Sequence, residues 1–230
     1  MKIFVALAVL LQGIAAQAAD GDTALKPVSD PKPILEDLQR KMSSLKSVYF
    51  EFEQQKQMQL FTEPQKSEGI MLIERPDRIR WETTAPYQSI MLGNQKSVAQ
   101  FEKTDSKWTK LRIGFPQMLK RVMEQMSLMH QGKLDALTSD FNISVATGAV
   151  AVVTMVPKDE NVRSMLASLD VKFEPDFSAS REVVMHEPNG DLTRIIFKRE
   201  KRDIAVPSGA FDQNKPVDIG AIKAAIGAGK

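Results

Sequence analysis

One stretch of sequence, residues 68–81, decides how this chain folds; it reads EGIMLIERPDRIRW. Its first half is apolar on both faces, which is typical of a strand that is covered on both sides. Its second half alternates instead, because charged residues surround Ile79 and Trp81, and this predicts a strand with one apolar face. Pro76 fixes the backbone between the two halves. The stretch therefore predicts two consecutive strands of a sheet.

Side-chain parity indicates which residues of this stretch share a face. Met71, Ile73 and Arg75 fall on one face, and Ile79 and Trp81 continue it if the proline turn preserves the register. An Arg on an apolar face needs a partner, because an unpaired buried charge is costly. We expect the Arg75 guanidinium to bond backbone carbonyls or an acid on a covering helix. The alternative is an Arg75 that caps the strand at the surface.

Further strands are predicted on both sides of this stretch. Upstream, Val48, Phe50 and Phe52 alternate with more polar residues. Downstream, Asn189-Gly190 is the strongest hairpin turn in the chain. The other predicted strands cover residues 88–92, 96–102, 108–113, 141–145, 149–156, 169–173, 181–186 and 192–199. Roughly ten strands with short turns predict one antiparallel sheet, which must roll up or be covered on one face.

Helical spacing occurs in two main places. Apolar residues between Ile34 and Leu45 form one stripe, with Pro33 in the first turn. Residues 116–131 form a second stripe that is rich in methionine, and a short helical piece follows at 134–137. A methionine stripe is usually core, but methionine also adapts to varied apolar ligands. The predicted fold class is α+β, with a few helices that cover one large sheet.

The chain begins like an exported protein. A positive residue precedes an apolar run, and Ala16-Gln17-Ala18 matches a cleavage site, so residues 1–18 are predicted to be a signal peptide. An uncleaved anchor is the alternative. We expect a mobile leader at 19–32, a single domain at 33–218 and a flexible tail at 219–230. The mature protein is expected to be a soluble monomer outside the cytoplasm.

Composition excludes several classes of function. The 31 Lys and Arg nearly balance the 29 Asp and Glu, so a net charge of +2 gives no reason to expect nucleic acid as a partner. The absence of Cys removes disulfides, thiol catalysis, zinc–thiolate sites and lipid attachment through Cys. His130 and His186 are expected to be structural. Because the sequence motifs of hydrolases, metalloproteases and nucleotide-binding enzymes are missing, we expect no catalytic residue, metal or cofactor.

A basic run occurs at Lys198, Arg199, Lys201 and Arg202. Its plain interpretation is a solvated strand edge, where Lys and Arg discourage edge-to-edge pairing. Its functional interpretation is a patch for anionic lipid or an acidic partner. We favour the strand edge, because runs of charge are usually solvated faces.

The order of several motifs resembles one known family. A Gly-containing strand runs into Arg75-Pro76, and Trp81 and Pro86 follow. Other motifs agree in position, namely the aromatic-x-x-x-Gln rhythm of Phe50 to Gln54, the strand end Val156-Pro157-Lys158, and the terminal Phe211 and Pro216. From about residue 34 to residue 218, the chain resembles the periplasmic outer-membrane lipoprotein carriers, the LolA-type family.

This resemblance implies an unclosed antiparallel half-barrel whose concave apolar face is covered by helices. It implies a periplasmic carrier that takes acylated lipoproteins, or a related lipid, from an inner-membrane ABC exporter to an acceptor lipoprotein in the outer membrane. Arg75 would bond the helical lid and help to hand over the cargo. Ile79, where an aromatic is common, and the strand after Gly93 depart from the family pattern. The residues expected to form the acyl cavity and its lid are Phe50, Phe52, Met71, Ile73, Arg75, Ile79, Trp81, Leu119, Val122, Met123 and Met126.

The energetics of acyl chains agree with a carrier. Each methylene is worth about 0.8 kcal/mol when buried, so a chain of about sixteen carbons is worth about 12 kcal/mol and does not cross water alone. An anchored acceptor of the same fold is disfavoured by the lack of Cys. A regulatory module of the same fold, which senses lipid or lipoprotein in the envelope, stays open as the second hypothesis, although such regulators are longer and carry a second domain.

Overall fold

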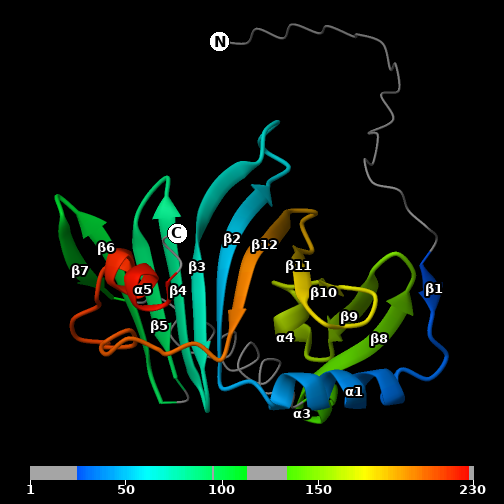
Figure 1. Ribbon diagram of the computed structural model, residues 1–230. Coiled ribbons are helices and arrows are strands. Elements are labelled where there is room, and N and C mark those ends of the chain that lie inside the picture. The colour runs from blue at the N-terminus through cyan, green and yellow to red at the C-terminus, as the bar shows by residue number, and fades with distance from the viewer. Residues whose placement is uncertain (1–24, 95, 113–133, 228–230) are drawn as a thin grey trace, which may run out of the picture.

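One antiparallel sheet dominates the computed structural model, which describes residues 25–94, 96–112 and 134–227 (Figure 1). The strands are β1 (Lys26–Pro27), β2 (Ser47–Gln57), β3 (Gln65–Glu74), β4 (Arg78–Ala85), β5 (Ser89–Gly93), β6 (Val98–Thr104), β7 (Lys107–Leu111), β8 (Phe141–Thr147), β9 (Ala151–Pro157), β10 (Ser168–Phe173), β11 (Ser180–His186) and β12 (Leu192–Arg202). The helices are α1 (Lys32–Ser43), α3 (Leu134–Asp140), α4 (Glu160–Arg163) and α5 (Ile219–Ala225).

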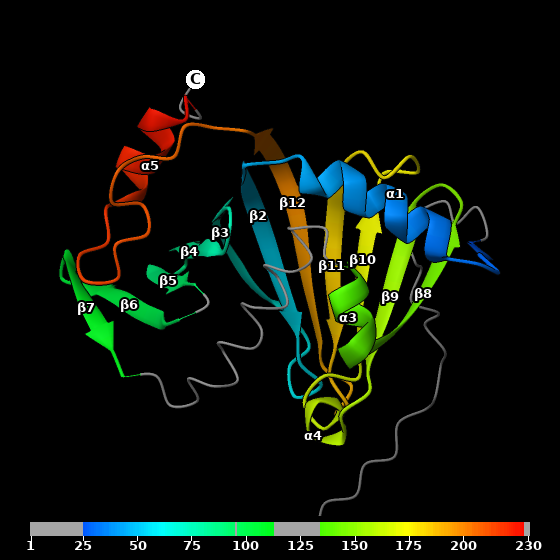
Figure 2. The same ribbon diagram turned by 90° about the horizontal axis from the view of Figure 1, so that it is seen from below.

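The sheet is open and strongly curved. Its twelve strands follow the order β1-β8-β9-β10-β11-β12-β2-β3-β4-β5-β6-β7, so β1 and β7 form its two edges. Seen from below, the strands follow an arc, with α3 on its concave side and α5 outside it (Figure 2). The predicted fold, a single unclosed antiparallel sheet with a few helices, is confirmed. The two strands predicted in residues 68–81 are β3 and β4.

Helix α1 begins at Lys32, one residue before the predicted proline. Pro33 lies in its first turn, where the missing N–H removes no helical hydrogen bond. Leu38 is buried against Leu137 of α3 and against Val153 and Phe173 of the sheet. The helix therefore covers the concave face, which we call the inner face, near the strands β8 to β10.

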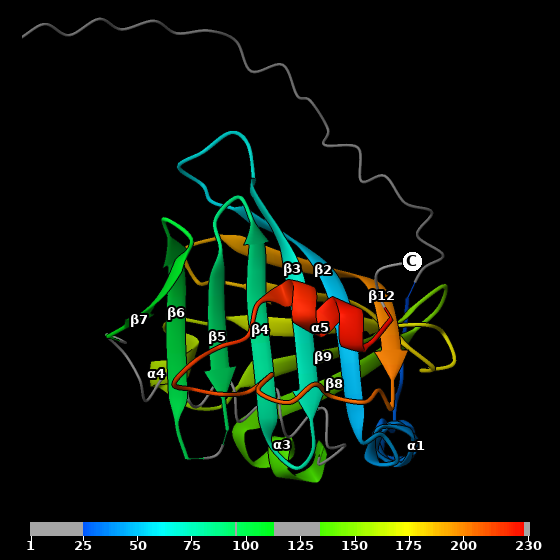
Figure 3. The ribbon, with the colours of Figure 1, turned by 60° about the vertical axis from the view of Figure 1, so that its left-hand side comes forward.

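The opposite, outer face carries a second apolar layer over β2 and β3. Tyr49, Ile70 and Leu72 are buried there beneath a segment that we call the C-terminal strap, residues 204–226. Helix α5 belongs to the strap and crosses the outside of the sheet in Figure 3, with Ile222 fully buried. The alternate residues of β3 are buried on the inner face. The prediction that this strand is covered on both sides is therefore confirmed.

A buried ion pair fixes the strap to the sheet. Arg80 is fully buried, and its Nε and Nη2 donate to Glu82 Oε2 at 2.9 and 2.6 Å. Its Nη1 and Nη2 also donate to the backbone carbonyls of Ala210 and Val217, at 2.8 and 2.5 Å. Burial raises the pKa of the Glu82 carboxyl, and the Arg80 guanidinium opposes that rise.

Two end segments differ from the sequence-based expectations. The flexible tail expected at 219–230 contains α5 instead, because Ile222 packs against the outer face, and only residues 228–230 of it lie outside the described residues. In the expected mobile leader, Lys26–Pro27 pairs with Ala146 and Thr147 of β8, and the Val28 N–H donates to the Val145 carbonyl at 2.9 Å. The expected signal peptide, residues 1–18, lies outside the described residues.

Candidate functional site

The inner face brings together all the sheet residues that sequence parity assigned to it. Register pairs Met71 with Phe50 and Trp81, and it pairs Ile73 with Ile79, so the proline turn preserves the alternation. The buried members of this cluster are Val48, Phe50, Phe52, Met71, Ile73, Ile79 and Ile195, and Trp81, Met91 and Phe197 pack against it half-buried. The structure therefore places these predicted lining residues on one apolar surface.

Gly69 makes this surface possible. A Cβ atom at this position would lie 1.9 Å from the Glu82 carbonyl oxygen and 2.8 Å from the tip of the Phe52 ring. Without that atom, the Phe52 ring fits against Trp81, with 4.6 Å between the ring centroids. Gly is thus required at this position of the strand, because the Phe52 ring and the Glu82 carbonyl both approach it closely.

The apolar surface continues along the sheet towards β8. A second buried cluster contains Val145, Val153, Val171 and Phe173, together with Leu38 and Leu137 from the two helices. Val183 of β11 packs against both clusters. An apolar strip therefore extends from β5 to β8 across the inner face.

Arg75 is tied to the helix that covers this strip. Its Nη2 donates to the carbonyl of Met42 in the last turn of α1 at 2.9 Å. The Met42 carbonyl also accepts the Leu45 N–H at 3.2 Å, and it lies at the negative end of the helix dipole, which makes it a good acceptor for a guanidinium. The Arg75 Nε is buried and donates to no acceptor among the described residues. The partner of Arg75 is thus one of the two expected kinds, a backbone carbonyl of a covering helix.

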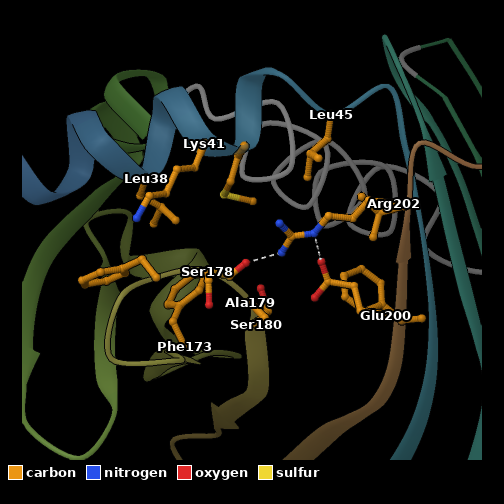
Figure 4. Close-up of a pocket in the computed structure, with 13 residues that line it drawn as sticks. Leu38, Lys41, Leu45, Phe173, Ser178, Ala179, Ser180, Glu200 and Arg202 are labelled. Atoms are coloured by element: carbon orange, nitrogen blue, oxygen red, sulfur yellow. Dashed lines mark hydrogen bonds and ion pairs between the residues drawn. The ribbon is translucent and has the colours of Figure 1, made fainter.

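A small cavity lies beside this contact, between α1, β12 and the β10–β11 turn (Figure 4). Its volume is about 40 Å³, room for about three water molecules. Apolar groups from Leu38, Leu45 and Phe173 line one part of it, and Glu200 and Arg202 line another. The cavity is too small to hold an acyl chain while α1 stays in this position.

The polar side of the cavity escaped sequence analysis because of a β-bulge. The register of β12 shifts between Phe197 and Arg199, so Glu200 faces Phe50 and Arg202 faces Val48 on the inner face. Arg202 donates from Nε to Glu200 and from Nη2 to the Ser178 carbonyl. The other carboxylate oxygen of Glu200, Oε2, is buried and accepts no hydrogen bond from the described residues. Strict alternation along β12 would not have predicted these side chains at the cavity.

The rest of the basic run is occupied with structural contacts. Lys198 and Arg199 pair with Glu53 and Glu51 of β2 at 3.3 and 3.2 Å. Lys201 donates to the carbonyls of Ile226 and Gly227 after α5, at 3.3 and 3.1 Å. Each of these cations is engaged in a structural contact, which does not favour a lipid patch. The expected strand edge is wrong, however, because β12 lies between β11 and β2 and not at an edge of the sheet.

The remaining predicted residues fall elsewhere. Leu119, Val122, Met123 and Met126 of the predicted methionine-rich helix lie outside the described residues, as does His130. His186 faces Asp170 on the outer face, with 3.0 Å between Nε2 and Oδ2, which agrees with a structural role. Within the described residues no group of acidic and His side chains has the arrangement of a metal site. Over the same residues no helix is long and apolar enough to cross a membrane.

Comparison with known proteins gives a consistent match. The family model of the outer membrane lipoprotein carrier protein LolA matches residues 43–214. The outer-membrane lipoprotein carrier protein of Pseudomonas putida strain GB-1 is 24% identical over 163 residues, which cover 70% of this chain and 74% of that protein. The protein of the same name from Chromohalobacter salexigens is 26% identical over 134 residues, or 58% of this chain and 60% of that one. Among solved structures, a LolA superfamily protein from Nitrosomonas europaea has a TM-score of 0.43 at 9% identity, with 81% of this chain and 99% of that chain covered.

Proposed function

Because the chain belongs to the LolA family of outer membrane lipoprotein carrier proteins, we propose that it carries acylated cargo across the periplasm. The cargo is an acylated lipoprotein or a related exported lipid. An inner-membrane ABC exporter loads it, and an acceptor lipoprotein in the outer membrane receives it. The proposed function is reversible binding and transfer, without a catalysed reaction.

One observation carries the proposal: an apolar strip covers the inner face of a sheet that does not close. The strip joins the cluster around Met71 and Trp81 to the cluster around Val153 and Phe173. Because the sheet does not close, an acyl chain can be admitted between its inner face and the helices that cover it. Burying an acyl chain of about sixteen carbons there is worth about 12 kcal/mol.

Among the described elements, helix α1 closes the cavity at one end of this strip. That cavity holds about 40 Å³, so an acyl chain can enter it only when α1 or the β10–β11 turn is displaced. The hydrogen bond from Arg75 to the Met42 carbonyl opposes that displacement. This hydrogen bond stabilises the closed, empty protein, so cargo must compete with it. Because the bond forms again when the protein closes, it favours release of the cargo.

Binding of a fluorescent fatty-acid probe tests the proposal. Met91 lies half-buried on the inner face opposite Trp81, and Val156 is similarly half-buried on the outer face of β9. Met91→Glu should weaken probe binding about tenfold or more, because it introduces a charge beside the bound chain. Val156→Glu, the matched control, should bind the probe like the wild type. Equal binding by Met91→Glu, with its fold intact by circular dichroism, would remove the inner face as the cargo site.

A further inference from the structure

The β2–β3 hairpin presents apolar side chains at its tip. Leu60 is 91% exposed and Phe61 is 52% exposed, whereas residues at hairpin tips are usually polar or glycine. The hairpin projects beyond the neighbouring strands in both Figure 1 and Figure 3. The tip is thus a protruding apolar turn, and it lies far from α1 and from the cavity.

The tip is a well-supported turn. The Phe61 N–H donates to the Met58 carbonyl at 3.0 Å, and Gln57 Nε2 donates to the Phe61 carbonyl at 2.9 Å. The Gln59 N–H donates to Asp191 Oδ1 in the β11–β12 turn at 3.0 Å, which braces the hairpin against its neighbour. Backbone contacts therefore hold Leu60 and Phe61 outward, and neither side chain belongs to the apolar clusters of the core.

A third exposed apolar side chain lies at the same end of the sheet. Tyr87 is 60% exposed in the turn between β4 and β5. The β4–β5 turn follows the β2–β3 tip at the same end of the sheet, because Ala85, the last residue of β4, pairs with Glu68, three residues after β3 begins. Three of the five large hydrophobic side chains exposed in the described part of the chain therefore occupy two neighbouring hairpin tips.

From this arrangement we propose that the β2–β3 tip inserts Leu60 and Phe61 into the surface of a lipid bilayer, with Tyr87 at the headgroup level. A protein partner needs a continuous, complementary surface, which separate apolar side chains on protruding turns do not provide. A bilayer needs no such match in shape, so these turns suit a bilayer better. Leu and Phe favour the acyl boundary, and Tyr favours the interface. This inference goes beyond cargo binding, since it assigns a surface at which the protein meets a membrane.

Charge around the tip predicts how the contact behaves. Within residues 56–68, around the turn, Lys56 and Lys66 balance Glu63 and Glu68. Attraction to anionic lipid therefore contributes little, and burial of apolar area supplies the binding. The contact should form on neutral phosphatidylcholine vesicles and should resist salt.

Vesicle flotation of the full chain with phosphatidylcholine tests this inference. The wild type should float with lipid in millimolar excess, at low and high salt alike. The double variant Leu60→Ser with Phe61→Ser should partition at least about tenfold less, because each side chain loses its burial in the bilayer. Leu25→Ser, which changes a residue 38% exposed at β1, should float like the wild type.

Several outcomes would overturn the inference. These are a wild type that stays with the aqueous fraction, a double variant that floats equally well, or binding that needs anionic vesicles and disappears in salt. A dimer that the double variant loses in the absence of vesicles would assign the tip to a second copy instead. The fatty-acid probe separates this result from the proposed function: the double variant should bind the probe normally, so each of the two measurements can fail while the other succeeds.

Discussion

At the scale of single residues, two positions on the inner face determine what it can do. Gly69 leaves room for the Phe52 ring and for the Glu82 carbonyl, which keeps the apolar surface smooth. Arg75 adds one charged group to that surface and ties it to the end of α1. Gly69 therefore determines the shape of the apolar surface, and Arg75 helps to hold α1 over it.

Gly69→Ala should destabilise the protein strongly. The new Cβ would lie 1.9 Å from a backbone oxygen, so the strands must separate. We expect the free energy of unfolding to fall by about 1–3 kcal/mol, the usual range for overpacking, as measured by urea denaturation. Gly220→Ala is the matched control, since nothing lies within 4 Å of its added Cβ in α5, and it should leave stability unchanged or slightly higher. Equal effects of the two changes would contradict this account of Gly69.

Arg75→Leu should affect release more than loading. Without the bond to the Met42 carbonyl, α1 loses a contact that competes with cargo, so the variant should load normally and transfer poorly. Arg75→Lys should rescue transfer only in part, because Lys lacks the planar fork of donors. A reconstituted assay with separate loading and transfer steps measures both. Normal transfer by Arg75→Leu would leave Arg75 with only a structural role.

Sequence parity predicted the inner-face residues but not the buried charges. Met71, Ile73, Ile79 and Trp81 were predictable because alternation survives the proline turn. Arg80 was not, because an Arg in an alternating strand is normally exposed, and only the C-terminal strap buries it. Residues near Glu200 were missed for a different reason, namely the bulge in β12.

At the scale of elements, the molecule has a cover on each face. Helix α1 is held on the inner face by apolar contacts, by the bond from Arg75 to the Met42 carbonyl, and by a bond from Lys41 Nζ to the Asp176 carbonyl at 2.6 Å. The strap covers the outer face through the apolar cluster around Ile222 and through Arg80, and it also bonds β6 and β7 through Asp218. The more numerous polar contacts of the strap predict that it stays in place when α1 moves.

Removing Arg80 should destabilise this attachment. Arg80→Met leaves the Glu82 carboxylate and two strap carbonyls buried without their donor, and we expect a loss of about 3–5 kcal/mol in the free energy of unfolding. Adding Glu82→Met should restore part of the loss, because the unpaired charge is then gone. Arg78→Met, which changes an exposed Arg on the same strand, should cost less than about 1 kcal/mol by urea denaturation. A mild effect of Arg80→Met would refute the proposed role of the pair.

Asp218 makes part of the strap contact sensitive to acid. Hydrogen bonds from Lys103 and from Trp108 lower the pKa of Asp218 below its ordinary value of 3.8. The resulting stability is fully present above that ordinary value and is lost as the pH falls through the lowered one. Asp218→Asn should therefore lose less stability than the wild type between about pH 5 and about pH 3. Because Asp218 is largely exposed, the difference should be small, and urea denaturation at the two pH values measures it.

Most of the strands and the first helix could be predicted from the sequence, but which strands lie side by side could not. Period-two and helical patterns, turn residues and the proline start of α1 identify most strands and the first helix. The pairing of β12 with β2 and the position of β8 between β1 and β9 have no local signal, since they depend on how the whole sheet curls. Strand β1 was not predicted, because a strand of two residues is too short to show an alternating pattern.

At the scale of the whole molecule, one open sheet separates three surfaces with different properties. The inner face offers an apolar strip that α1 covers at one end, the strap covers the outer face over β2 and β3, and the β2–β3 tip presents exposed apolar side chains. A carrier needs such a separation, because cargo must be shielded from water while the protein still meets the surfaces between which it moves.

Mass spectrometry of the intact protein, purified from its native periplasm without denaturant, can detect bound cargo. We expect that a fraction of the protein carries a non-covalently bound acylated lipoprotein or lipid, which denaturation releases. The Met91→Glu variant should retain less of it, and Arg75→Leu should retain more. A wild-type protein that carries no acylated species, and that equally fails to take one up from an inner-membrane donor, would contradict the account.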